Sequence, residues 1–89
     1  MSVVRVPPVL RAEAGGAREV EASGATVREL LEDLAARVPA LGEKVYDGSE
    51  IRAYVNVYVD GDDVRTGLGL DHVVPAGAEV LVLPSVAGG

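Results

Sequence analysis

The C-terminal end of the chain carries the most specific chemistry in this sequence. An apolar run over residues 80–83 stops at Pro84, and the last five residues read SVAGG. Glycine has no side chain and adopts nearly any backbone geometry, so a Gly-Gly end can thread a narrow channel. Five extended residues reach about 17 Å at ~3.4 Å per residue. We expect residues 85–89 to form a flexible tail that presents the Gly89 carboxylate to another enzyme, with Val86, Ala87 and Gly88 as the threading residues.

Other polar and glycine-rich groups favour structural roles over catalysis. The segment DGDDV at residues 60–64 suggests a cation loop, but Val64 occupies a place where a calcium loop needs an oxygen donor, so a solvated turn is expected. His72 is the only histidine and the chain has no cysteine, so we expect a surface or half-buried side chain. The GLG at residues 67–69 lacks the lysine and hydroxyl residue of a phosphate loop. We therefore expect no catalytic side chain and no metal site.

Two tyrosines mark a possible partner surface. Apolar and polar residues alternate through AYVNVYV at residues 53–59, which predicts a strand followed by an Asp-Gly turn. Tyr54 and Tyr58 would then share the sheet face that points away from the helix. They either cover that face or anchor a partner, because tyrosine is enriched at protein interfaces. On the second interpretation the partner-binding residues are Tyr54, Tyr58 and Leu83, which lies just before the tail.

One helix must position these elements, and its start is clearly marked. The sequence Thr26-Val27-Arg28-Glu29 fits a capping box, in which the hydroxyl and the carboxylate satisfy free backbone N–H groups. Apolar residues follow at spacings of three and four, which predicts one buried stripe. Pro39 should end the helix, because the residue before a proline avoids helical geometry. The stripe consists of Val27, Leu30, Leu31, Leu34, Ala35 and Val38.

The remaining apolar runs predict strands. We expect strands over about residues 2–7, 18–22, 53–59 and 79–83, a very short one at Val64, and single helical turns near residues 41–47 and 70–74. The first and last strands are the most uniformly apolar, so pairing them at the sheet centre buries both. This order predicts an α+β fold of the β-grasp (ubiquitin-like) type, with a mixed sheet of four to five strands on one main helix. The β-grasp domain would span residues 1–84, with residues 85–89 as the tail.

Composition narrows the class of protein. The chain has 89 residues, which is one small domain, and 48% of them are hydrophobic, which supports a packed core. The net charge of −6 would repel phosphate backbones, so nucleic-acid binding is not expected. No apolar run is long enough to span a membrane, the start does not read as a signal peptide, and the lack of cysteine fits a cytoplasmic protein.

Taken together, these features resemble a known family. The strand and helix order with the terminal AGG resembles the ubiquitin-like sulfur carriers of the ThiS/MoaD group. The stretches VNVYVDGDDVR and VLVLPSVAGG, with PPVLR near the start, are most similar to its CysO-type branch. The resemblance covers nearly the whole chain. A Gly-Gly end alone is weakly specific, because ubiquitin and several carriers share it.

The resemblance implies a carrier that supplies no catalytic side chain and binds no cofactor itself. An E1-like adenylyltransferase/sulfurtransferase would use ATP to adenylate Gly89, and a sulfur donor would displace AMP to leave a thiocarboxylate. The implied acceptor is a cysteine synthase that contains pyridoxal phosphate (PLP), with a zinc metallopeptidase releasing the product. Two other acceptors stay open, namely molybdopterin synthase and a thiosugar or secondary-metabolite enzyme. From a different class, the chain could be a ubiquitin-like modifier conjugated to lysine.

Overall fold

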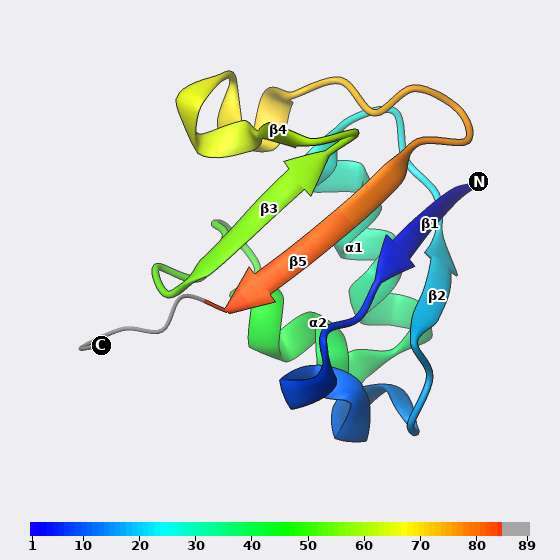
Figure 1. Ribbon diagram of the computed structural model, residues 1–89. Helices are drawn as coiled ribbons and strands as arrows, with labels where there is room; N and C mark the ends of the chain where they lie inside the picture. Colours follow the sequence, from blue (N-terminus) through cyan, green and yellow to red (C-terminus); the bar gives the residue numbers. More distant parts are fainter. Residues whose placement is uncertain (85–89) are drawn as a thin grey trace.

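A five-stranded mixed sheet with the order β2-β1-β5-β3-β4 forms one layer of the protein (Figure 1). The computed structural model describes residues 1–84. The fold is therefore the predicted α+β β-grasp arrangement, with all five strands in one sheet. The strands are β1 (Ser2–Arg5), β2 (Glu19–Ala22), β3 (Val55–Val59), β4 (Asp62–Asp63) and β5 (Glu79–Pro84).

The first and last strands pair at the centre of the sheet, as their apolar composition predicts. β1 runs parallel to β5, with Val4 opposite Val80, and β3 runs antiparallel on the other side of β5. Val4, Val80 and Val82 are fully buried. Over Glu79–Leu81, β5 lies between β1 and β3, so its backbone N–H and C=O groups are satisfied within the sheet, whereas among residues 1–84 Val82–Pro84 pair with β3 alone. The last strand is thereby anchored at the centre of the sheet and runs on beside β3 as far as Pro84.

The predicted helix is α1 (Val27–Arg37), and it begins as the capping pattern indicates. The Thr26 Oγ1 accepts a hydrogen bond from the Glu29 N–H at 3.3 Å. The Glu29 carboxylate accepts one from the Ala25 N–H at 2.9 Å, one residue earlier than the ideal box. The apolar stripe packs on the sheet, and the fully buried members are Val27, Leu30, Leu31 and Leu34.

A second helix, α2 (Pro39–Val45), is longer than the single turn expected near residues 41–47. Pro39 ends α1 and also begins α2, because proline lacks the N–H that a first helical turn leaves unused anyway. Leu41 and Val45 are fully buried in the same core. Figure 1 shows α1 and α2 on one side of the sheet, so neither covers the opposite face.

Several predicted boundaries were wrong. The first strand stops at Arg5 rather than residue 7, and a 3₁₀-helix, η1 (Pro8–Ala14), follows it. Val64 is not in a strand but begins the 3₁₀-helix η2 (Val64–Thr66), since the Asp63 carboxylate caps that turn. The turn expected at residues 70–74 is η3 (Gly69–Asp71). Among residues 1–84, no helix is long and apolar enough to cross a membrane.

Candidate docking face and tail exit

The site begins where β5 ends. Pro84 lies opposite Val55 in the β3–β5 register, so the chain leaves the sheet beside the start of β3. The predicted tail residues Val86, Ala87, Gly88 and Gly89 lie outside the described residues. The structure thus places the base of the tail, at Pro84, at the end of a strand that is paired on both sides over Glu79–Leu81 and with β3 as far as Pro84.

The open face of the sheet next to this exit combines two of the three predicted partner-binding residues. Tyr58 pairs with Leu81, and Asn56 pairs with Leu83. Because the valines at 55, 57 and 59 point into the core, Asn56 and Tyr58 lie on the opposite face with Leu81 and Leu83. The Leu83 residue is 37% exposed. An apolar and tyrosine-bearing surface therefore lies next to the tail exit.

Tyr54 does not lie on this strand, so that part of the prediction was wrong. β3 begins only at Val55, and Tyr54 belongs to a turn that the Val55 N–H closes by donating to the Arg52 carbonyl at 3.0 Å. The cause is this turn, which takes up the residues just before Val55, and Val55 lies opposite Pro84, the last described residue of β5. Tyr54 is 47% exposed and directly precedes the strand.

Arg65 holds this turn in place, and sequence reasoning missed it. Its Nη2 donates to the carbonyl oxygens of Arg52 at 2.7 Å and Val55 at 2.6 Å. The Asp63 Oδ1 accepts from the Arg65 N–H at 2.9 Å and so fixes the start of the turn that carries the arginine. A helix-cap residue followed two positions later by arginine has no special meaning in a sequence, so no signal could have identified the contact.

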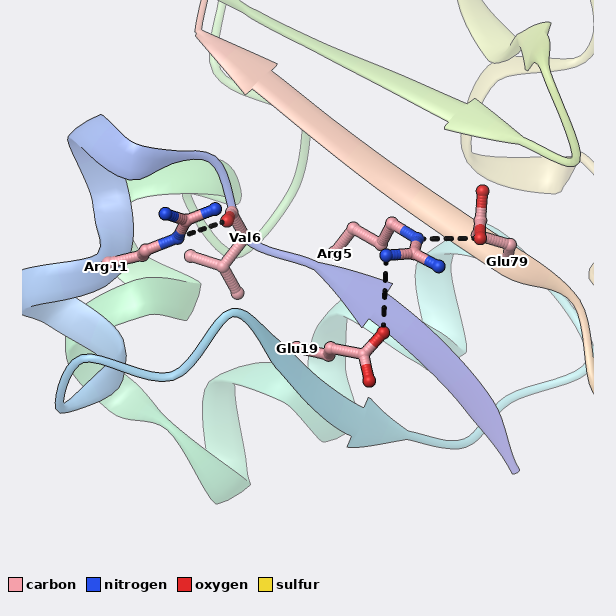
Figure 2. Close-up of polar contacts among 5 residues, drawn as sticks. All are labelled: Arg5, Val6, Arg11, Glu19 and Glu79. Carbon is pink, nitrogen blue, oxygen red and sulfur yellow. Dashed lines mark hydrogen bonds and ion pairs between the residues drawn. The ribbon is translucent and has the colours of Figure 1, made fainter.

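A hollow of about 370 Å³ opens on the other side of the β5 end, and three arginines line it together with Leu81 and Leu83. Arg5 of β1 bridges two carboxylates, Glu79 at 2.6 Å and Glu19 at 3.4 Å (Figure 2). The hydrogen bond to Glu79, followed by the charges of both carboxylates, raises the pKa of Arg5. Arg11 donates its Nε to the Val6 carbonyl at 3.1 Å, and Arg18 is the third.

The aspartates and the histidine that the sequence singled out have structural roles. Asp60 has a positive φ of 49° in a two-residue turn between the paired residues Val59 and Asp62, where an Asp-Gly pair fits well. The Asp60 Oδ1 also accepts from the Glu79 N–H at 2.9 Å. His72 is half-buried, and its carbonyl accepts from the Val27 N–H. Within residues 1–84, no group of three or more potential ligands could hold a metal ion.

Comparison with known proteins agrees with this geometry. The ThiS family model matches residues 4–89. The sulfur carrier protein CysO of Mycobacterium tuberculosis is 38% identical over 97% of this chain and 96% of its own length. A putative sulfur carrier protein of Archaeoglobus fulgidus is 36% identical over 83% of this chain and 85% of its own.

Solved structures agree as well. A chain in the crystal structure of the Amycolatopsis orientalis BexX/CysO complex is 37% identical, covers all of both chains and superposes with a TM-score of 0.90. The small archaeal modifier protein 1 of Methanosarcina acetivorans is 28% identical over 99% of this chain and 95% of its own, with a TM-score of 0.83. The chain therefore belongs to the ThiS family and is a CysO-type, ubiquitin-like sulfur carrier.

Proposed function

We propose that this chain carries sulfur as a thiocarboxylate on Gly89 and delivers it to a biosynthetic acceptor enzyme. The supporting observation is the placement of the tail base, because β5 is held between β1 and β3 and ends at Pro84, five residues before a Gly-Gly end. A strand anchored in the sheet, followed in the sequence by a short segment that ends in Ala-Gly-Gly, suits delivery of a terminal group into another protein. The similarity to CysO sulfur carriers supports sulfur as the cargo.

The proposed chemistry starts with activation, because a carboxylate is anionic at pH 7 and a poor electrophile. The Gly89 carboxylate attacks ATP in an E1-like activating enzyme, which forms an acyl-adenylate and releases pyrophosphate. A sulfur donor then attacks the acyl carbon and displaces AMP, which leaves the thiocarboxylate. Ionised sulfur is the nucleophilic form, so the cargo is ready to react with the acceptor. The chain needs no cysteine for this, because the sulfur resides on its terminus.

The acceptor that the CysO similarity favours is a PLP-dependent cysteine synthase. The new cysteine would then be attached to the carrier and released by a zinc metallopeptidase. A crystal structure of a CysO protein in complex with BexX supports the general idea that such carriers dock on another protein. A molybdopterin synthase or a thiosugar enzyme is the alternative acceptor, and incubation with each candidate acceptor distinguishes them by the sulfur-containing product.

A second candidate function is conjugation to lysine as a protein modifier. The observation in its favour is the similarity to two structures of small archaeal modifier protein 1, from Methanosarcina acetivorans and Haloferax volcanii. Both functions need an activated C-terminal acyl group, but they end differently. Intact-mass analysis of the protein from its native cell separates them, because a carrier exchanges one oxygen for sulfur whereas a modifier is found on lysine adducts.

The first prediction tests the reacting end directly. The wild-type protein, incubated with activating enzyme, ATP and a sulfur source, should gain roughly 16 Da from exchange of oxygen for sulfur at the terminal acyl group. Deletion of Gly89 or substitution Gly88→Val should abolish this gain, because a β-branched side chain stiffens and widens the thread. Gly88→Ala is the matched control and should retain part of the activity.

The Gly89 deletion and Gly88→Val should both keep the wild-type thermal unfolding midpoint. That result would exclude a folding defect as the cause of lost thiolation. Thiolation of Gly88→Val at the normal rate would refute the narrow-channel argument, and absence of thiolation in the wild type would refute sulfur carriage by this route.

A further inference from the structure

Side chains of opposite charge lie near the two ends of β5. The β3–β4 hairpin carries Asp60, Asp62 and Asp63 at the end of the sheet where Val59 pairs with Val80. The other end, where Pro84 leads to the tail, borders the hollow lined by three arginines. The whole chain has only eight basic residues and a net charge of −6. Three of the eight therefore gather beside the tail exit of an otherwise acidic protein.

Two of these arginines have no carboxylate partner among residues 1–84. Arg5 is neutralised by Glu19 and Glu79. Within residues 1–84, the Arg11 side chain donates a single hydrogen bond, from Nε to a backbone carbonyl, and neither Arg11 nor Arg18 forms an ion pair. Figure 2 shows the Arg11 guanidinium at the end of β1, apart from the two carboxylates that hold Arg5. A guanidinium with free N–H groups is suited to bidentate contact with a carboxylate.

The hollow also has an apolar floor. Leu81 and Leu83 of β5 line it, and Pro7 and Pro8 form part of its wall. Water is displaced more readily from such a floor than from a polar one, and partial exclusion of water strengthens an ion pair formed above it. The site thus offers apolar contact and two positive charges to a partner that approaches along β5.

We propose that this arginine hollow binds an acidic segment of the activating enzyme, next to the mouth of the channel that receives the tail. The proposal rests on the proposed function, since it assumes that an activating enzyme takes the Gly89 carboxylate. Carboxylates on the enzyme would pair with Arg11 and Arg18, while apolar residues beside them cover Leu81 and Leu83. The acidic hairpin at the far end would repel the same segment, so the charge division sets the direction in which the carrier docks.

The test measures binding of the full-length carrier to its activating enzyme without nucleotide, together with thiolation rates at varied carrier concentration. Arg11→Gln/Arg18→Gln should weaken binding roughly ten- to a hundredfold and lessen its salt dependence. The same double variant should raise the KM for the carrier and leave kcat unchanged, because the arginine contacts stabilise the bound carrier and the transition state equally. Lys44→Gln removes one equal charge from α2, and because Lys44 does not line the hollow, both quantities should stay unchanged.

Two further variants keep the test independent of folding. The Arg18 side chain forms no hydrogen bond or ion pair within residues 1–84, and its carbonyl keeps the bond from the Val6 N–H in any variant, so Arg18→Gln alone should leave the fold intact and still weaken binding. Arg11→Lys/Arg18→Lys keeps both charges but loses the bidentate geometry, so its affinity should fall between those of the wild type and the Gln double variant.

Unchanged affinity and KM in the folded Gln double variant would overturn the proposal while sulfur carriage stands. An effect that arises only with ATP would also overturn it, because the arginines would then contact the nucleotide phosphates. A loss of binding only to the acceptor enzyme would assign the hollow to that partner instead. If even the wild type is never thiolated, the proposed function fails first, and the mass measurement separates that result from the others.

Discussion

Single carboxylates in this fold act mainly by accepting backbone hydrogen bonds. Asp33 in α1 accepts from the Ser23 N–H at 2.8 Å and from the Arg37 Nε at 2.6 Å. The first of these bonds, more than the second, lowers the pKa of Asp33 below its ordinary value of 3.8. The contact joins the helix to the loop after β2, so a charge on one surface residue stabilises the connection between two elements.

The second prediction follows from this shift. A carboxyl whose pKa is lower in the folded state stabilises the fold above the unfolded pKa, and this contribution is lost as pH falls through the folded pKa. Asp33→Asn should therefore lower the urea midpoint at pH 7, and the difference from wild type should shrink as pH falls below 3.8. Asp62→Asn, at an exposed strand position, is the control and should show no such trend. An equal loss at neutral and acid pH would contradict the assignment.

At the scale of elements, the two α-helices pack unusually closely at one glycine. Gly42 is buried in α2, and a Cβ added there would lie 2.4 Å from the Cα of Ala35 in α1. Real Cβ atoms do not approach backbone atoms so closely. Any larger residue at position 42 would therefore force α2 away from α1. Gly42 thus determines how near α2 lies to α1.

The third prediction sets two effects against each other. In an exposed helix, Gly→Ala stabilises by up to about 1 kcal/mol. At Gly42 the clash with the backbone of Ala35 should dominate, so Gly42→Ala should destabilise the protein by about 1–3 kcal/mol, as overpacked cores do. Urea unfolding measures the difference. Glu43→Ala, at the exposed neighbouring position, should change stability by less than about 0.5 kcal/mol. A more stable Gly42→Ala protein would show that the helices separate without cost.

For the whole molecule, the arrangement of the sheet makes the N-terminus essential. β1 lies between β2 and β5, with Val4 opposite both Val20 and Val80. Val4 and Val6 belong to the core, and the Val6 N–H donates to the Arg18 carbonyl at 2.8 Å. The first residues of a domain usually tolerate truncation, but here they fill the middle of the sheet.

The fourth prediction is that deletion of residues 1–6 unfolds the protein. The deletion exposes an edge of β2 and an edge of β5 and removes two core valines, so no cooperative thermal transition should remain by circular dichroism. Extension of the chain before Met1, which is 55% exposed, should leave the transition intact. A cooperative transition in the truncated protein would mean that β2 or another segment replaces β1 beside β5.

Local chemistry determined much of this protein. The capping residues before α1, its apolar spacing and Pro39 act through neighbours along the chain, and the helix appears at the predicted position. The apolar character of the first and last strands was enough to predict their central pairing. The end of β3 was readable from Asp60-Gly61, whereas its start was not, because Ala53 and Tyr54 continue the alternating pattern but lie in the turn that the Val55 N–H closes.

The tertiary structure alone decided what surrounds the tail base. Arg5, Arg11 and Arg18 follow no helical or strand period, and they meet Leu81 and Leu83 only because β1 pairs in parallel with a strand more than seventy residues later. Arg65 donates to two backbone carbonyls, and Tyr54 lies outside β3. Both features likewise depend on which segments of the chain meet in the folded protein. Contacts of this kind depend on which distant segments lie side by side in the sheet. The order of neighbouring residues along the chain does not predict that arrangement.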